Sequence, residues 1–198
     1  MNLKVTPLLL FIVAIFLSCT GKSTTETGET KDSARLVQDT LGDILYTIDF
    51  KVKAAKEERK NFEDGIIPWI NIANPELNIE RLMEGDRVVL PFKSVLLLVD
   101  YPLNTPAVFL IETTNEGFSR KQLIKEISTR YKYVYQEEEK SATTKTIPLE
   151  KRQGPINRNQ TNGKYGIWGH DITDLDLNAI EVHRNGKGTI TLLLAVES

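Results

Sequence analysis

The chain has 198 residues, of which 25 are basic and 27 acidic, so its formal net charge is −2 at neutral pH. A chain of this length supports one domain with a proper core rather than two. The slight acidic excess argues against nucleic acid as a partner. The chain contains a single cysteine, which excludes an internal disulfide, so packing must supply the stability.

The first nineteen residues have the order of a secretory signal. Lys4 supplies a positive charge, a run of ten apolar residues extends from Leu8 to Leu17, and Ser18 and Cys19 follow. A helix of this length measures about 15 Å, half the hydrocarbon thickness of a bilayer. The segment therefore predicts a cleaved signal rather than a membrane-spanning anchor.

The sequence Phe16-Leu17-Ser18-Cys19 resembles the lipobox of bacterial lipoproteins, although Phe16 stands where Leu is usual. In that family the cysteine is alkylated with diacylglycerol, the chain is cut before it, and the new amino terminus is acylated, for example with palmitate. The resemblance implies a signal peptide over residues 1–18 and attachment to the cell envelope membrane through lipid on Cys19. Thr20, where inner-membrane members have Asp, implies the outer membrane. The alternative is an ordinary signal that ends at a chance cysteine.

The segment after the cysteine predicts a flexible tether. Thr20–Lys31 is rich in Thr, Gly and charge and has no apolar side chain, so it cannot bury anything. As a coil it would span roughly 20 Å. We therefore divide the chain into residues 1–18, a lipidated tether over residues 19–32, and one globular domain over residues 33–198.

A helical pattern opens the domain. Apolar side chains recur at steps of three and four, as at Ile44, Ile48 and Val52. The pattern predicts a long helix from about Ser33 to Phe62 that packs on the core. The functional alternatives are a helix lying in the membrane interface or a helix that binds a partner.

Five segments predict strands. The first three are Arg87–Leu90, Ser94–Tyr101 and Ala107–Thr114, and turn residues between the last two predict an antiparallel hairpin. A second hairpin is predicted for Ala179–Arg184 and Thr189–Val196, because the Asn-Gly pair between them is a strong hairpin signal.

A second helix is predicted between the two hairpins. Ser119 and Gln122 have the spacing of a capping box, and an apolar face continues to about Glu137. The resulting order of elements has no regular alternation of strand and helix, which argues against a doubly wound fold. We therefore predict an α+β fold, in which two long helices pack on an antiparallel sheet of four to six strands.

A long basic loop is predicted after this helix. Residues 140–164 have few apolar side chains and carry six basic residues against one acid. The four candidates for binding an anionic ligand, a lipid headgroup or an acidic glycan are Lys151, Arg152, Arg158 and Lys164. The alternative is that the basic residues offset the three acids of Glu137–Glu139 at the helix end.

Residues 163–176 are the segment in which chemistry could be assembled locally, because three glycines, two aromatics, a His and three Asp fall within fourteen residues. His170 with Asp171 could form a general base oriented by a carboxylate. His170, Asp174 and Asp176 are candidate metal ligands, although the sequence has no metal signature of recognised spacing and no Ser-nucleophile motif. The structural alternative is that Asp171 and Asp174 cap a turn.

Two functional classes stay open. A non-catalytic envelope lipoprotein that binds an envelope protein or a ligand accounts for the anchor, the tether and the lack of motifs, and it is favoured. An envelope hydrolase that uses His170 and Asp171 accounts only for the crowded segment. No cofactor is expected in either case, and neither class specifies the ligand.

Overall fold

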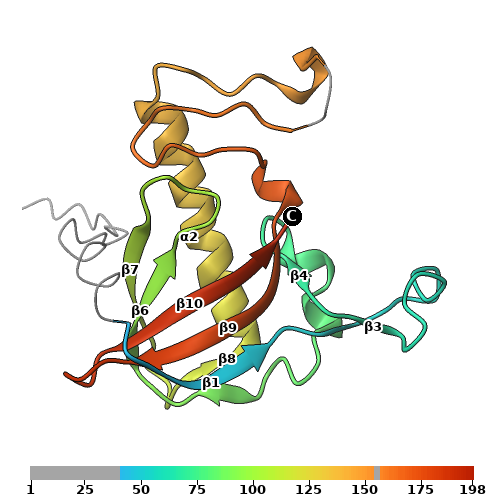
Figure 1. Cartoon of the computed structure of the whole chain (residues 1–198). Coiled ribbons are helices and arrows are strands. Elements are labelled where there is room, and N and C mark those ends of the chain that lie inside the picture. Colours follow the sequence, from blue (N-terminus) through green and yellow to red (C-terminus); the bar gives the residue numbers. More distant parts are fainter. Residues whose placement is uncertain (1–40, 154–156) are drawn as a thin grey trace, which may run out of the picture.

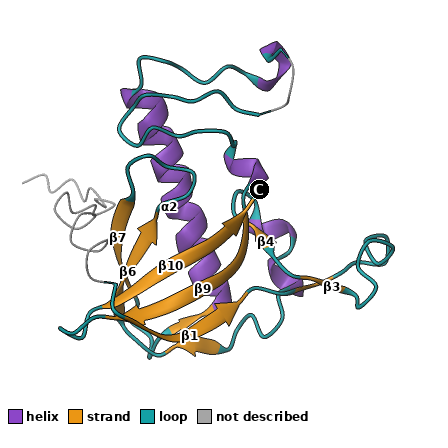
Figure 2. Ribbon diagram, viewed as in Figure 1, coloured by secondary structure: helices purple, strands orange, loops and turns teal. Residues whose placement is uncertain are grey.

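The computed structural model describes residues 41–153 and 157–198, so the predicted signal, Cys19 and the tether lie outside the described residues. The described chain is a mixed α/β structure, in which a six-stranded sheet carries one long helix against one face (Figure 1, Figure 2). The strand order is β1-β9-β10-β6-β7, with β4 beside β9. Among these residues, no helix has the length and apolar character needed to cross a membrane.

The elements have the following bounds. The strands of the main sheet are β1 Asp43–Asp49, β4 Ile70–Asn71, β6 Ser94–Val99, β7 Ala107–Glu112, β9 Asp176–Arg184 and β10 Ile190–Glu197. Two small sheets pair β2 Val52–Lys53 with β3 Ile66–Ile67, and β5 Val88–Leu90 with β8 Phe118–Ser119. The helical elements are α2 Arg120–Ser141 and the short 3-10 turns η1 Pro75–Leu77, η2 Ile79–Arg81, η3 Leu149–Lys151 and η4 Ile172–Asp174.

A parallel strand pair in the middle of the sheet corrects the prediction of an antiparallel sheet. β10 runs antiparallel to β9 but parallel to β6, with Thr191 opposite Leu96 and Leu193 opposite Leu98. The two predicted hairpins, β6 with β7 and β9 with β10, are confirmed. Because β6 and β10 run in the same direction, the residues that follow them lie at the same edge of the sheet.

The predicted helix from Ser33 to Phe62 is wrong in its described part, so one long helix replaces the two that were predicted. Residues 43–49 form β1 beside β9, residues 52–53 form β2, and turns follow. A spacing of four residues fits the period of a strand as well as that of a helix. The burial pattern has the two-residue period of extended chain, with buried side chains at Ile48, Phe50, Val52 and Ala54.

Helix α2 begins where the sequence predicts. The backbone N–H of Ser119 donates to Gln122 Oε1 at 2.8 Å, and the backbone N–H of Gln122 donates to Ser119 Oγ at 3.3 Å. The helix covers one face of the sheet (Figure 1). Its buried apolar residues, which share the main core with the inward side chains of the strands, are Leu123, Ile124, Ile127, Tyr131 and Val134.

The opposite face of the sheet carries a smaller apolar cluster. Leu98 and Val108 are buried there, and Leu41, Leu96 and Leu193 pack against them. Along β6 these side chains alternate with residues of the main core, as expected of a strand whose two faces are both apolar.

Candidate functional site

The site begins at the end of α2, where the buried carboxylate of Glu138 fixes the following loop. Its Oε1 accepts from the backbone N–H of Gly163 at 2.7 Å, and its Oε2 accepts from those of Tyr165 and Gly166 at 2.8 and 3.1 Å. Burial would raise the pKa of Glu138, but hydrogen bonds from the Thr161 side chain and these three N–H groups outweigh it and lower the pKa. Glu138 is therefore ionised at neutral pH and holds the loop to the helix.

A tight turn then docks the chain against the carboxyl end of β6. Gly169 has a φ of +71°, which favours glycine, and it lies between Trp168 and His170. The N–H of His170 donates to the carbonyl of Trp168 at 2.8 Å, and the N–H of Trp168 donates to the carbonyl of Pro102 at 3.2 Å. These bonds bring Trp168 and His170 next to Tyr101.

We call the three rings that meet here, Tyr101, Trp168 and His170, the aromatic cluster. The ring centroids of Tyr101 and Trp168 are 5.3 Å apart at an interplanar angle of 84°, which is a favourable edge-to-face contact. His170 lies 5.6 Å from Tyr101 and 5.8 Å from Trp168. Trp168 nevertheless keeps 37% of its surface exposed. The cluster is packed on itself and presents an indole to solvent.

Hydroxyl groups join the aromatic cluster to the sheet and to α2. Tyr101 Oη lies 2.8 Å from Ser198 Oγ, which lies 3.3 Å from His170 Nε2. From α2, Tyr131 donates its hydroxyl to the carbonyl of Tyr101, and Tyr135 donates to the carbonyl of His170, both at 2.9 Å. Burial raises the pKa of both of these tyrosines, so they remain protonated donors at neutral pH. One helix thus fixes the backbone beneath two of the three rings.

His170 and Asp171 are adjacent, but their side chains have different partners. The carboxylate of Asp171 accepts two hydrogen bonds from Arg152, at 2.6 and 2.9 Å, and lies 3.8 Å from Nε of Arg158. The imidazole of His170 contacts Ser198 and the two rings of the cluster. The carboxylate that could orient the imidazole is therefore held by the two arginines.

Arg158 is buried and its hydrogen bonds stay within the protein. Its Nη2 donates to the hydroxyl of Thr146 at 2.6 Å, and its Nη1 donates to the carbonyl of Ile167 at 3.3 Å. Its guanidinium lies 5.5 Å from the centroid of the Tyr135 ring, within the range of a cation–π contact. Burial lowers the pKa of Arg158, although the charge of Asp171 acts in the opposite direction.

The two lysine candidates lie elsewhere on the loop. Lys151 is exposed on η3, next to Arg152, whose side chain turns to Asp171. Lys164 places its ammonium 5.1 Å from the ring centroid of Tyr165. Of the four basic candidates, Arg152 and Arg158 are thus brought together at one internal carboxylate.

The candidate metal ligands point to separate partners. Asp174 accepts the backbone N–H of Asp171 at 2.9 Å and closes the η4 turn, and Asp176 accepts from the side chain of Asn71 at 3.1 Å. His170 lies with Ser198 in the aromatic cluster. In residues 41–153 and 157–198, no group of three or more His, Cys, Asp or Glu side chains could hold a metal ion.

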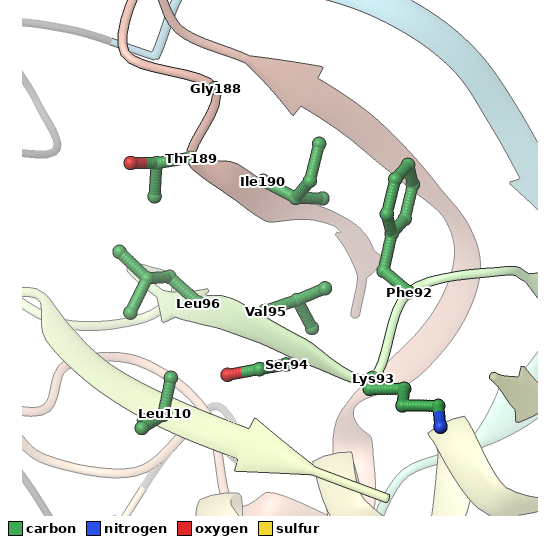
Figure 3. Close-up of a pocket in the computed structure, with 9 residues that line it drawn as sticks. All are labelled: Phe92, Lys93, Ser94, Val95, Leu96, Leu110, Gly188, Thr189 and Ile190. Atoms are coloured by element: carbon green, nitrogen blue, oxygen red, sulfur yellow. The ribbon is translucent and has the colours of Figure 1, made fainter. Parts of the chain in front are cut away.

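A cleft lies at the other end of the parallel strand pair. It has a volume of about 330 Å³ and lies between the amino ends of β6 and β10, with Leu110 of β7 at its side (Figure 3). Phe92, Leu96 and Ile190 supply apolar walls, and Leu110 is 45% exposed. Lys93 directs its ammonium away from these side chains (Figure 3). Ser94 and Thr189 add hydroxyl groups to the lining, so the cleft is of mixed character.

Comparisons of the chain with protein-family models, with curated proteins and with solved structures find no match in any of the three. No function can therefore be inferred from a similar protein, and a function has to be argued from the site itself.

Sequence reasoning drew attention to the segment of Trp168 and His170 but missed Tyr101 and Ser198. Each of these two residues follows an almost continuous apolar strand. In an antiparallel pair the ends of β6 and β10 would lie at opposite edges of the sheet, so only the parallel pairing brings Tyr101 and Ser198 together. The two apolar segments correctly indicate buried strands, but the sequence does not specify whether the strands run parallel or antiparallel.

Proposed function

We propose that this protein is a non-catalytic binding protein of the bacterial cell envelope, anchored by lipid on Cys19, and that it binds through the aromatic cluster. The observation that carries the proposal is Trp168, an exposed indole held by ring contacts to Tyr101 and His170. An aromatic side chain that is already fixed loses little conformational freedom on binding, and such residues serve as anchors in many interfaces.

The charged candidates support a binding role over a catalytic one. The two arginines and Asp171 satisfy one another inside the protein, and Asp174 closes a turn. The aromatic cluster, in contrast, contains Trp168, which is 37% exposed, and the exposed residue Ser198 lies beside it. Around the aromatic cluster, the groups that this arrangement leaves for a ligand are therefore aromatic and hydroxylic.

Palmitate labelling tests the anchor. Labelled palmitate should enter the wild-type protein, and Cys19→Ala should abolish the labelling and leave a soluble or unprocessed form, because the alanine offers no thiol to alkylate. Labelling of the alanine variant would contradict lipidation at Cys19. Fractionation into the inner membrane would contradict the placement in the outer membrane that Thr20 suggests.

Cross-linking in intact envelopes tests the binding surface. Wild type should give a defined cross-linked species that Trp168→Ala loses, because the variant removes the exposed indole. The matched control is Leu149→Ala, which truncates another exposed apolar side chain outside the cluster. An identical cross-linking pattern in all three proteins would contradict binding through Trp168.

One observation favours a hydrolase as the second candidate. Ser198 Oγ lies 3.3 Å from Nε2 of His170, near the reach of a nucleophile and its general base. Tyr101 also holds Ser198, and the neighbouring carboxylate is bound to Arg152. We expect no hydrolysis of activated esters above background. An activity that both Ser198→Ala and His170→Ala abolish would establish the hydrolase and contradict the non-catalytic role.

A further inference from the structure

The aromatic cluster offers an apolar face and hydroxyl groups with little charge. Tyr101, Trp168 and Ser198 offer a phenol, an indole and a hydroxyl rather than a carboxylate or an ammonium, and the nearby Asp171 is paired with Arg152 at 2.6 Å. A strongly charged ligand would therefore find no matching charge among the side chains of Tyr101, Trp168 and Ser198. The ligand that fits is neutral.

The packing of the rings excludes a cage for a quaternary ammonium. Such a cage directs several ring faces at one central cation, within about 6 Å of each centroid. Here Tyr101 and Trp168 are nearly perpendicular at 5.3 Å, and His170 closes the triangle at 5.6 and 5.8 Å. The rings fill the centre themselves, so a ligand must contact the exposed part of Trp168.

The hydroxyl groups beside the indole argue against a purely apolar ligand. Tyr101 Oη and Ser198 Oγ are 2.8 Å apart, and each can donate and accept a hydrogen bond. An acyl chain laid over them would remove their contact with water without replacing it, which costs free energy. A ligand with hydroxyl groups of its own would replace the lost water.

A pyranose ring combines these features, because one of its faces consists of C–H groups and its rim carries hydroxyls. We propose that the aromatic cluster binds a neutral saccharide of the cell envelope. One sugar ring stacks on Trp168, and its hydroxyls bond to Tyr101 and Ser198. This inference rests on the proposed binding function and names its ligand class.

The backbone beneath the cluster suits such a ligand. Saccharides bind weakly unless the protein groups are fixed beforehand, since ordering costs reduce the affinity. Tyr131 and Tyr135 hold the carbonyls of Tyr101 and His170 at 2.9 Å from buried positions on α2. The free protein therefore already fixes the backbone of two of the three rings.

Tryptophan fluorescence gives a direct test, because the chain has two tryptophans and Trp69→Phe leaves Trp168 as the only one. The full chain in this background is titrated with tetra-N-acetylchitotetraose and with maltotetraose. We expect a saturable change of Trp168 emission with at least one of them. By calorimetry, Trp168→Ala should weaken the binding about tenfold or more, as when a central aromatic contact is truncated.

Two further variants separate the stacking from the hydrogen bonds and from folding. Tyr101→Phe keeps the ring and removes the hydroxyl, so affinity should fall roughly threefold to tenfold. Leu110→Ala removes an exposed apolar side chain at the far end of the strands and should bind as the wild type does. Circular dichroism spectra that match the wild type show that each variant is folded.

The outcomes distinguish the saccharide from the binding function. A lack of saturable response to both saccharides overturns the saccharide inference. If cross-linking still depends on Trp168 in that case, the proposed binding function stands. If cross-linking is also unchanged, both fail. Binding to phosphatidylethanolamine–phosphatidylglycerol vesicles that Trp168→Ala abolishes, without a saccharide response, would make Trp168 a membrane contact and overturn the inference.

Discussion

The two ends of the β6–β10 pair carry different chemistry on the same two strands. At the carboxyl ends, Tyr101 and Ser198 are joined by a hydrogen bond and meet the exposed Trp168. At the amino ends, Ile190 and Leu110 line a cleft that has no ring contacts between the residues described in its walls, although Ser94 and Thr189 also line it (Figure 3). The first surface is held by directional bonds from α2, whereas the second follows from the apolar character of the strands. A surface whose side chains are fixed by such hydrogen bonds can select a ligand better than a surface without them.

The largest effect on stability is expected for Glu138, which holds the loop at the carboxyl ends of β6 and β10. Glu138→Ala removes the acceptor of three backbone N–H groups in a buried position, so we expect a loss of about 3 kcal/mol or more in the free energy of unfolding. Urea denaturation measures the loss. Glu137→Ala removes the neighbouring acid, which pairs with Lys140 on the surface, and should cost no more than about 1 kcal/mol.

A pH series tests whether the ionised form of Glu138 stabilises the loop. Because the folded pKa of Glu138 is lowered, its contribution to stability is fully present above its unfolded pKa and is lost as the pH falls through the folded value. The wild type should therefore lose more stability than Glu138→Gln between about pH 6 and pH 3. Urea midpoints over this range measure the difference. Equal slopes for the two proteins would show that the loop is not held by the ionised carboxylate.

Removing one hydroxyl under the aromatic cluster should have an intermediate effect. Tyr131→Phe leaves the ring in the core but deprives the carbonyl of Tyr101 of its donor at 2.9 Å, so we expect a loss of about 1 to 2 kcal/mol. The emission of Trp168 should shift in the folded variant. An unchanged emission would mean that α2 does not position the cluster.

The smallest effect is expected at the amino end. Leu110→Ala truncates a side chain that is already 45% exposed, so stability should change by about 0.5 kcal/mol or less. Trp168 emission should stay as in the wild type. A large loss of stability in Leu110→Ala would mean that the side chains of the cleft stabilise the fold as much as those at the carboxyl ends do. The contrast between the two ends would then be wrong.

The sequence predicted the elements whose signals are local. The capping box of Ser119 with Gln122 and the hairpin signalled by the Asn-Gly pair before β10 depend on a few residues each, and both are confirmed. The hairpin connection itself closes between Asn185 and Thr189, with a positive φ at Gly188. The chain after Gly42 was wrongly predicted as a helix because its apolar spacing satisfies two periods. Pairing with β9 decided between them, and that pairing joins residues far apart in the sequence.

The candidate site was predictable only in part for the same reason. His170 stands in a crowded segment that composition alone identifies, but its partner Ser198 comes from the end of another strand. The buried role of Glu138 was also missed, since three consecutive acids at a helix end are usually solvated. Which of the three points inward depends on the loop that returns to it.

The position of β10 has a consequence for how the sheet is completed. β10 follows every other strand in the sequence, yet it lies between β9 and β6, so it alone joins the β6–β7 hairpin to β9, β1 and β4. Before residues 190–197 leave the ribosome, the two halves of the sheet share no backbone ladder. Strand β10 therefore completes the sheet, because its ladders to β9 and to β6 turn two separate halves into one structure.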